Sequence, residues 1–225
     1  MPLVFMACRV LESVLAPRLR QAGLSARFMD YGYHRVPQLM TPALQTELDA
    51  LSEPSLVVLG YGLCGNGLAG LKAGRHTLLV PRADDCISML LGSHTRYLEE
   101  FAREPGTYYL TKGWLESGSH PLKEHHELLE KYDAETVEWL LDEQYKNYRR
   151  LALVAPTEEE LAACRPQALE VAEFCAQRWG FRYEEIVGSS ELIERLVQLA
   201  LQPAADDDFL IIPPGGEIKQ EMFWR

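Results

Sequence analysis

Strand-like and helix-like segments alternate along most of this 225-residue chain, and this alternation constrains the fold more than any other feature. Short apolar runs such as 2–8, 55–62 and 76–81 have the length and composition of buried strands, and longer helix-like runs separate them. Strands that alternate with helices form a mainly parallel sheet with helices on both faces. We therefore predict a three-layer α/β protein with a Rossmann- or flavodoxin-like sheet.

A polar helical stretch divides the predicted strands into two sets. The strands are predicted at 2–8, 25–32, 55–62, 76–81, 106–113, 149–156, 181–188 and 207–216. We also predict a helix with Thr41 as its N-cap and one continuous helix over 86–104. The prediction is two α/β lobes, 1–118 and a smaller 149–225, bridged by helices in 119–148. It leaves open whether the last strands join the first sheet.

Composition and charge exclude several classes of partner. The net charge of -11 argues against nucleic-acid binding, which needs stripes of Lys and Arg. No apolar run approaches the roughly 20 residues of a membrane span, so no membrane partner is expected. The first segment lacks the basic leader of a signal peptide, which predicts a cytoplasmic protein. The five cysteines are odd in number, so reduced thiols or metal ligands are expected in place of disulfides.

Three cysteines fall just past predicted strands. Cys8 ends the first strand, Cys64 follows the third, and Cys86 follows the fourth and opens a helix. In the strand order 2-1-3-4-5 these strands are neighbours, and ligands bind at their carboxyl ends. Helix N-termini after Cys64 and Cys86 would favour thiolates. Three converging thiolates repel one another unless a cation offsets their charge, so the pattern predicts a metal site.

The spacing does not settle which metal these thiols would hold. We favour zinc with an open position for water or substrate, and a [4Fe-4S] cluster with one non-cysteine corner is the alternative. Glu12 or His94 could supply a further ligand. Cys164 and Cys175 fall on the apolar face of one long predicted helix and are expected to be bystanders.

The loop "GYGLCGNG" at 60–67 and the segment "PRADDC" at 81–86 add polar candidates around the thiols. The amides of Gly65, Asn66 and Gly67 could form an anion-binding nest. Arg82 could bind a carboxylate, or hold Asp84 in a salt bridge. Asp85 is either the N-cap of the next helix or a residue that supports the metal ligands.

Two further segments are expected to complete the pocket. "PGTYYLTKGW" at 105–114 ends the fifth strand at the same sheet edge, so Lys112 and Trp114 are predicted to line the site. A water-excluding site also needs a cover. The segment 213–217, with Glu217, is predicted to face the cysteines across a cleft.

The motifs taken together resemble the family called domain of unknown function 1638. The resemblance covers nearly the whole chain. It rests on "AC" at 7–8 with Glu12, "GYGLCGNGLAGL" at 60–71, "PRADDCISMLLGS" at 81–93, "PGTYYLTKGW" at 105–114 and "FLIIPPGG" at 209–216. The resemblance implies an association with partner proteins of corrinoid-dependent methyl transfer, and hence one-carbon or thiol chemistry.

The hypothesis that follows is a metal-thiolate enzyme acting on a small-molecule substrate, with a corrinoid-system protein as a further partner. Cys8, Cys64 and Cys86 hold the metal, and Asp85 and Lys112 are the candidate catalytic residues. Gly65–Gly67, Arg82 and Trp114 are the candidate ligand-binding residues. An iron-sulfur protein, or a non-catalytic binding module or metallochaperone, is the alternative. The substrate, the reaction and the oligomeric state do not follow from the sequence.

Overall fold

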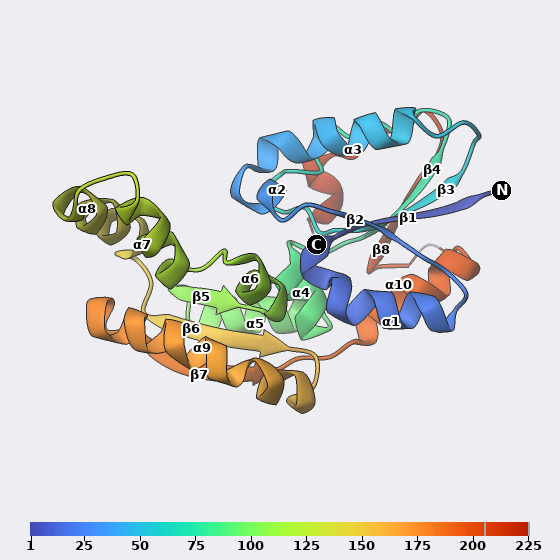
Figure 1. The fold of residues 1–225 in the computed structure, drawn as a ribbon. Coiled ribbons are helices and arrows are strands. Elements are labelled where there is room, and N and C mark those ends of the chain that lie inside the picture. Colours follow the sequence, from blue (N-terminus) through green and yellow to red (C-terminus); the bar gives the residue numbers. More distant parts are fainter. Residues whose placement is uncertain (205, 225) are drawn as a thin grey trace. The chain divides into compact units, whose positions relative to one another are not determined.

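The computed structural model describes residues 1–204 and 206–224, with all side chains in these ranges except those of residues 34 and 35. The chain divides into two compact units (Figure 1). Unit 1 consists of residues 1–96 and 190–225, and unit 2 consists of residues 97–189. Each unit contains a sheet with parallel strands and covering helices, so the predicted α/β class is confirmed.

Unit 1 is built on a five-stranded sheet in the order β2-β1-β3-β4-β8. Its strands are β1 (Leu3–Cys8), β2 (Arg27–Met29), β3 (Leu56–Gly60), β4 (Thr77–Pro81) and β8 (Phe209–Ile212). The first four strands in this order are parallel, and β8 runs antiparallel to β4. The order 2-1-3-4 agrees with the prediction, and β8 takes the place that was expected for the fifth strand.

Helices cover both faces of this sheet. They are α1 (Glu12–Gln21), α2 (Gly32–Arg35), α3 (Met40–Asp49), α4 (Cys86–Leu91), α10 (Glu191–Leu201) and the 3-10 turns η1 (Arg9–Leu11), η2 (Pro37–Leu39) and η3 (Gln220–Phe223). On one face, Leu44 and Leu48 of α3 share a core cluster with Val57 and Leu59 of β3. On the other face, α10 contacts α1, α4 and β3. All five residues of β3 are buried, as expected for a central parallel strand.

Unit 2 contains a three-stranded parallel sheet in the order β5-β6-β7. Its elements are β5 (Thr107–Leu110), α6 (Lys112–Ser117), α7 (Pro121–Leu129), α8 (Ala134–Tyr145), β6 (Arg150–Ala155), α9 (Glu158–Trp179) and β7 (Arg182–Val187), and α5 (His94–Arg103) spans the division between the units. The long helix α9 lies along β6 and β7 (Figure 1). Within the described part of the chain, none of the helices is both long enough and apolar enough to cross a bilayer.

The strand β5, which follows α5, belongs to the three-stranded sheet of unit 2 and not to the five-stranded sheet of unit 1. Residues 107–110 pair with β6, whereas β8 near the C-terminus returns to pair with β4. Of the last strands, only β8 joins the sheet of unit 1, and β6 and β7 form the sheet of unit 2 with β5. The prediction that "TKGW" ends at the same sheet edge as the cysteines is wrong, because β5 finds its parallel partner in the other sheet.

Two helix predictions also need correction. The predicted helix over 86–104 is two helices, because Gly92 adopts a left-handed conformation (φ 87°) that ends α4. Thr41 is not an N-cap, because a 3-10 turn at 37–39 precedes α3 and carries the chain directly into the helix. Instead, the Thr41 hydroxyl donates a 2.6 Å hydrogen bond to the carbonyl of Gly67, which ties α3 to the glycine-rich loop.

Candidate functional site

The carboxyl ends of β1, β3 and β4 place the three predicted thiols at one edge of the unit 1 sheet. Cys8 is the last residue of β1, Cys64 follows the end of β3 by four residues, and Cys86 begins α4 just after β4. The three strands are adjacent and parallel, so their carboxyl ends share an edge. Small residues bring β1 and β3 together here: Ala7 pairs with Gly60, where an added Cβ would lie 2.6 Å from the Ala7 Cβ.

The loops that carry Cys64 and Cys86 are joined by their backbones. The N–H of Leu63 donates to Ala83 over 2.8 Å, and the N–H of Cys64 donates to Asp84 over 2.7 Å. Gly62 permits this approach, since a Cβ at this position would lie 2.7 Å from both the Cα and the N of Asp85. The glycine at 62 is therefore required by the close contact of the two loops, which is one recognised use of glycine.

The loop itself is a left-handed turn and not the short helix that the sequence suggested. Cys64, Gly65 and Asn66 have φ values of 49°, 61° and 70°. Left-handed backbone is unusual for residues other than glycine and clusters at functional sites. Gly67 closes the turn, because its N–H donates a 3.1 Å hydrogen bond to the Cys64 carbonyl. The Gly67 amide is thus already used, which leaves Gly65 and Asn66 as candidates for the predicted anion nest.

Burial sets the ionisation of the three thiols. Desolvation raises the pKa of Cys8 to about 11, and it raises the pKa values of Cys64 and Cys86 further above the usual range. Hydrogen bonding from the N–H groups of Gly62 and Cys86 lowers the pKa of Cys64 by a smaller amount. Burial thus outweighs the smaller effect of the local backbone on the pKa values of Cys64 and Cys86, so ionisation of these thiols would need a compensating cation.

The thiols are close enough to influence one another's pKa values. Charge on Cys8 raises the pKa of both Cys64 and Cys86, and charge on Cys64 raises the pKa of Cys86. Asp85 raises the pKa of Cys64 and Cys86, and Asp30 raises that of Cys8. Cys86 is buried, whereas Cys8 and Cys64 keep partial access to solvent. The edge is therefore a largely buried, acidic setting in which a cation would stabilise ionised thiols.

Tyr61 belongs to this site, although no sequence pattern singles it out. The residue is 2% exposed and packs in the core cluster against which Cys8 and Cys64 also lie. Burial, and then the charges of Cys8, Cys64 and Tyr33, raises the pKa of its phenol. Its hydroxyl has no hydrogen-bond partner among the described residues. A tyrosine one residue past a buried strand resembles ordinary core, so only the structure reveals the neighbouring thiols.

The other predicted ligands have different contacts. Glu12 lies 3.6 Å from Arg9 in an exposed ion pair. The Nδ1 of His94 lies 2.8 Å from the Oδ2 of Asp84. In the part of the chain that the structure describes, no group of three or more His, Cys, Asp or Glu side chains is arranged to hold a metal ion.

Asp85 and Arg82 both have structural contacts. Asp85 is the N-cap of α4, because its Oδ1 accepts hydrogen bonds from the N–H groups of Ile87 (2.8 Å) and Ser88 (3.1 Å). This cap fixes the start of the helix at Cys86. The Arg82 guanidinium donates to the carbonyl of Trp224, so it is directed toward the C-terminal segment of unit 1.

Lys112 and Trp114 lie in unit 2, whereas the thiols lie in unit 1. Both residues are in α6, which begins at Lys112 with Thr111 as its N-cap. The Nζ of Lys112 is 3.9 Å from Glu116, and the charge of Lys112 partly offsets the burial that raises the pKa of Cys164. Trp114 is buried, with its ring centroid 6.3 Å from that of Tyr108.

The predicted cover is at the wrong end of the sheet. Because β8 is antiparallel to β4, Ile212 pairs with Leu78 near the start of β4, and the chain leaves β8 at the edge opposite the thiols. There the N–H of Gly215 donates a hydrogen bond to the carbonyl of Gly74, and the backbones of Glu217 and Lys72 form an isolated antiparallel β-bridge. The prediction that 213–217 faces the cysteines is therefore wrong, since it assumed that the last strand runs parallel to the others.

The two remaining cysteines lie elsewhere. Cys164 and Cys175 are buried in α9 of unit 2, where burial raises the pKa of Cys175 to about 12. Each acts as a small apolar side chain on the buried face of α9, and the two together provide a control pair for experiments on the thiols of unit 1.

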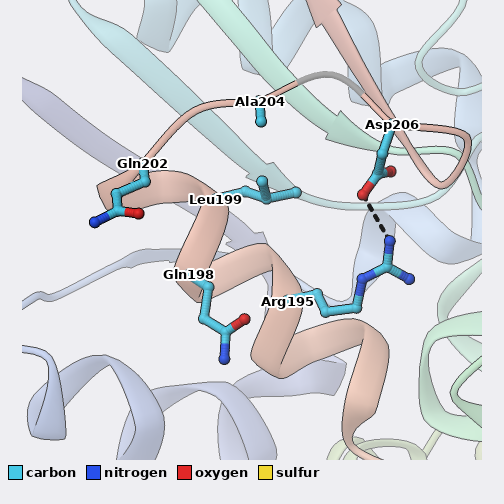
Figure 2. Close-up of a pocket in the computed structure, with 6 residues that line it drawn as sticks. All are labelled: Arg195, Gln198, Leu199, Gln202, Ala204 and Asp206. Carbon is cyan, nitrogen blue, oxygen red and sulfur yellow. Dashed lines mark hydrogen bonds and ion pairs between the residues drawn. The ribbon is translucent and has the colours of Figure 1, made fainter.

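A surface pocket of about 300 Å³ lies beside α10 (Figure 2). It is lined by Arg195, Gln198, Leu199, Gln202, Ala204 and Asp206. Figure 2 shows Arg195 reaching across to Asp206, and the guanidinium is 2.6 Å from that carboxylate and 2.5 Å from Asp208. Its charge is already balanced by these two carboxylates. The pocket offers no nucleophile or metal-binding thiol, so we assign the candidate site to the cysteine edge.

Comparison with known proteins identifies one family. A family model described as "Protein of unknown function (DUF1638)" matches residues 28–197, which is more than half of the chain. No curated protein gives a significant match, and neither does any solved structure.

Proposed function

Since this chain belongs to the DUF1638 family, whose description names no activity, we propose its function from the thiol site itself. Cys8, Cys64 and Cys86 bind a soft metal centre that serves thiol or methyl-group chemistry on a small-molecule substrate in the cytoplasm. We favour zinc with an open position, with a [4Fe-4S] cluster as the alternative. The observation that supports the proposal is the position of three thiols at the carboxyl ends of adjacent parallel strands.

The chemistry of the donor set fits such a centre. Thiolate sulfur is the ligand that zinc and iron-sulfur clusters share. Three buried thiolates would repel one another and the nearby Asp30 and Asp85, so a cation removes the main obstacle to their ionisation. The strand ends fix the backbones, and rotation about χ1 moves each sulfur between staggered positions. We propose that such rotations complete the ligand group.

The remaining roles follow from the positions of the chain's own residues. A bound metal of this kind supplies Lewis acidity that lowers the pKa of a substrate thiol or water. The partial exposure of Cys8 and Cys64 provides a side from which a substrate can approach. Asp85 holds Cys86 at the start of α4. In the methyl-transfer version, the substrate thiol would release its proton to solvent and its sulfur would form a bond to the methyl carbon of a methylated corrinoid on a partner protein, while the cobalt–carbon bond breaks and its electron pair stays on the corrinoid; this version follows the family resemblance. The proposal keeps Lys112 as a candidate catalytic residue and Trp114 as a candidate ligand-binding residue.

The direct test is the metal content of protein purified without oxygen. We expect zinc, or iron with inorganic sulfide and a brown colour, in stoichiometric amounts. Replacement of any one of Cys8, Cys64 and Cys86 by serine should weaken metal binding by more than about 100-fold, since each removes a direct ligand. The matched control is Cys164→Ala/Cys175→Ala, which should keep full metal content. Equal loss in the control, or full retention in all three single variants, would contradict the proposal.

Metal binding should also depend steeply on pH. Because burial raises the pKa of Cys8 to about 11 and those of Cys64 and Cys86 further, the three thiols are protonated at pH 7 and must lose their protons to bind. The apparent affinity for Zn²⁺ should therefore fall as the pH falls. Titration of Zn²⁺ into weakly buffered apoprotein should release close to three protons per ion. Release of fewer than two would mean that not all three thiols are ligands.

A second candidate function is favoured by the partial exposure of Cys8 and Cys64. Exposed thiols suit a carrier that delivers its metal to another protein without turnover. The rate at which a small chelator removes Zn²⁺ distinguishes the two: loss within seconds indicates a carrier, and retention over hours indicates a resident centre.

A further inference from the structure

Tyr61 has an unusual position for a polar side chain. Its ring lies in the core cluster between the sheet and α3, together with Met6 and Met40. Only 2% of the residue is exposed, and its hydroxyl has no partner among the described residues. A buried hydroxyl that makes no hydrogen bond destabilises the folded state relative to a phenylalanine. A purely apolar role would therefore be filled better by Phe, and the hydroxyl requires another explanation.

Two thiols and the phenol of Tyr33 lie near Tyr61. Cys8 and Cys64 pack against the same cluster, and both are close enough to influence the phenol electrostatically. A neutral thiol is a weak hydrogen-bond acceptor, whereas a thiolate is charged and accepts strongly. A tyrosine keeps its proton at neutral pH and can act as a donor. An ionised, metal-bound sulfur beside Tyr61 would therefore give this buried hydroxyl the acceptor that it lacks.

We propose that Tyr61 is a positioning residue of the thiol site, whose hydroxyl donates a hydrogen bond to the Cys8 or Cys64 sulfur when that sulfur is ionised and bound to metal. This inference rests on the proposed function. It assigns to Tyr61 the stabilisation of charge on a ligand sulfur and the fixing of that sulfur's rotamer. Such partners of metal ligands commonly change metal affinity by about 10- to 100-fold.

The test is Tyr61→Phe, which keeps the ring and removes only the hydroxyl. Co²⁺ is the probe, because its sulfur-to-metal charge-transfer absorption reports the electron density on the ligand sulfurs. We expect the variant to bind one Co²⁺ per chain with an affinity lower by about 10-fold or more. The charge-transfer band should shift to lower energy, because a thiolate that loses a hydrogen bond is easier to oxidise. The metal-free variant should unfold at a denaturant concentration no lower than wild type.

Tyr145→Phe is the matched control. The Tyr145 hydroxyl has a partner, Glu124 at 2.6 Å in unit 2, so its loss should destabilise the metal-free protein and leave the Co²⁺ affinity and spectrum unchanged. If Tyr61 had only a structural role, Tyr61→Phe would likewise destabilise the metal-free protein and leave the Co²⁺ affinity and spectrum unchanged.

The outcomes distinguish failure of the inference from failure of the proposed function. If wild type binds Co²⁺ through the three cysteines and Tyr61→Phe binds with the same affinity and spectrum, the inference about Tyr61 is overturned and the proposed function stands. If wild type binds no Co²⁺, or binds it equally well without the three cysteines, the proposed function fails and the inference fails with it. Weaker binding with a shifted band supports both.

Discussion

Gly62→Ala should both destabilise unit 1 and disrupt the thiol site. The added Cβ would lie 2.7 Å from the Cα and N of Asp85 and 2.8 Å from the carbonyl oxygen of Ala83. These are backbone atoms, so no side-chain rotation can relieve the contact. The two loops must separate, which weakens the hydrogen bonds that Leu63 and Cys64 donate to Ala83 and Asp84. We expect the free energy of unfolding to fall by about 3 kcal/mol, at the upper end of the range for overpacking.

The same substitution should reduce metal affinity by at least about 10-fold, because Cys64 and Cys86 are held in register by these loops. The control is Gly74→Ala. Gly74 has a left-handed φ of 56°, and no atom lies within 4 Å of the position that an added Cβ would take, so alanine there is strained but meets no neighbour. It should cost about 1 kcal/mol and leave metal binding unchanged. Chemical denaturation and Zn²⁺ competition titrations measure both quantities. Wild-type affinity in Gly62→Ala would show that the loop contact does not set the thiol geometry.

The strand ends of the first sheet could be predicted because local signals and topology agree there. Runs such as 55–62 and 76–81 are short and apolar, and parallel strands with helical crossovers must place their carboxyl ends at one edge. The position of three cysteines just past three such strands was therefore informative without any contact information. Their raised pKa values were not predictable, because they depend on how deeply the surrounding loops bury each sulfur.

The partner of each remaining strand was harder to predict. The strands β5 and β8 are each four residues long, and nothing local to either specifies which sheet it joins. The exchange of the two had consequences for the site. It moved Lys112 and Trp114 into unit 2, and it placed 213–217 at the opposite edge of the first sheet. The wrong sheet assignment of β5 and the wrong placement of 213–217 therefore have one physical origin, the long-range pairing of short edge strands.

Finer features of the site depend on tertiary contacts. The left-handed conformation of Cys64 costs energy in isolation, and the loop adopts it because its backbone is held against 83–85 and α3. The glycines of this loop allow two close contacts within the protein, at Gly60 with Ala7 and at Gly62 with Asp85. Tyr61 carried no signal, since a tyrosine beside a buried strand is common in cores.

Replacement of Arg150 by methionine should strongly destabilise unit 2. The Arg150 side chain is 1% exposed, and its guanidinium donates to Thr107 (2.8 Å), Glu184 (2.8 Å) and Glu100 (3.2 Å). Methionine fills the volume but leaves two carboxylates without this cation. Removing one partner of a buried ion pair costs about 3–5 kcal/mol, and we expect the lower end because Glu184 is one-third exposed and also contacts Arg103.

The pH dependence of this loss separates charge from packing. The hydrogen bond from Arg150 lowers the pKa of Glu184, so it contributes stability that is present above the ordinary glutamate pKa and is lost as the pH falls through the lowered value. In Arg150→Met the carboxylates of Glu100 and Glu184 repel each other, which favours their protonation. Acid therefore removes this repulsion and part of the variant's loss of stability. The difference in unfolding free energy should therefore be largest near pH 7 and shrink below about pH 4.5.

A double variant that also replaces the Glu184 carboxylate by a neutral amide tests the role of charge. Arg150→Met/Glu184→Gln should recover part of the loss at pH 7, because the second substitution removes one of the two carboxylates that methionine leaves without their cation. Urea denaturation of the wild type, both single variants and the double variant gives the coupling between Arg150 and Glu184. A pH-independent loss with no recovery in the double variant would mean that Arg150 contributes through packing of its aliphatic chain. In that case the network of Thr107, Glu100 and Glu184 would not be what holds β5, β6 and β7 together at their amino ends.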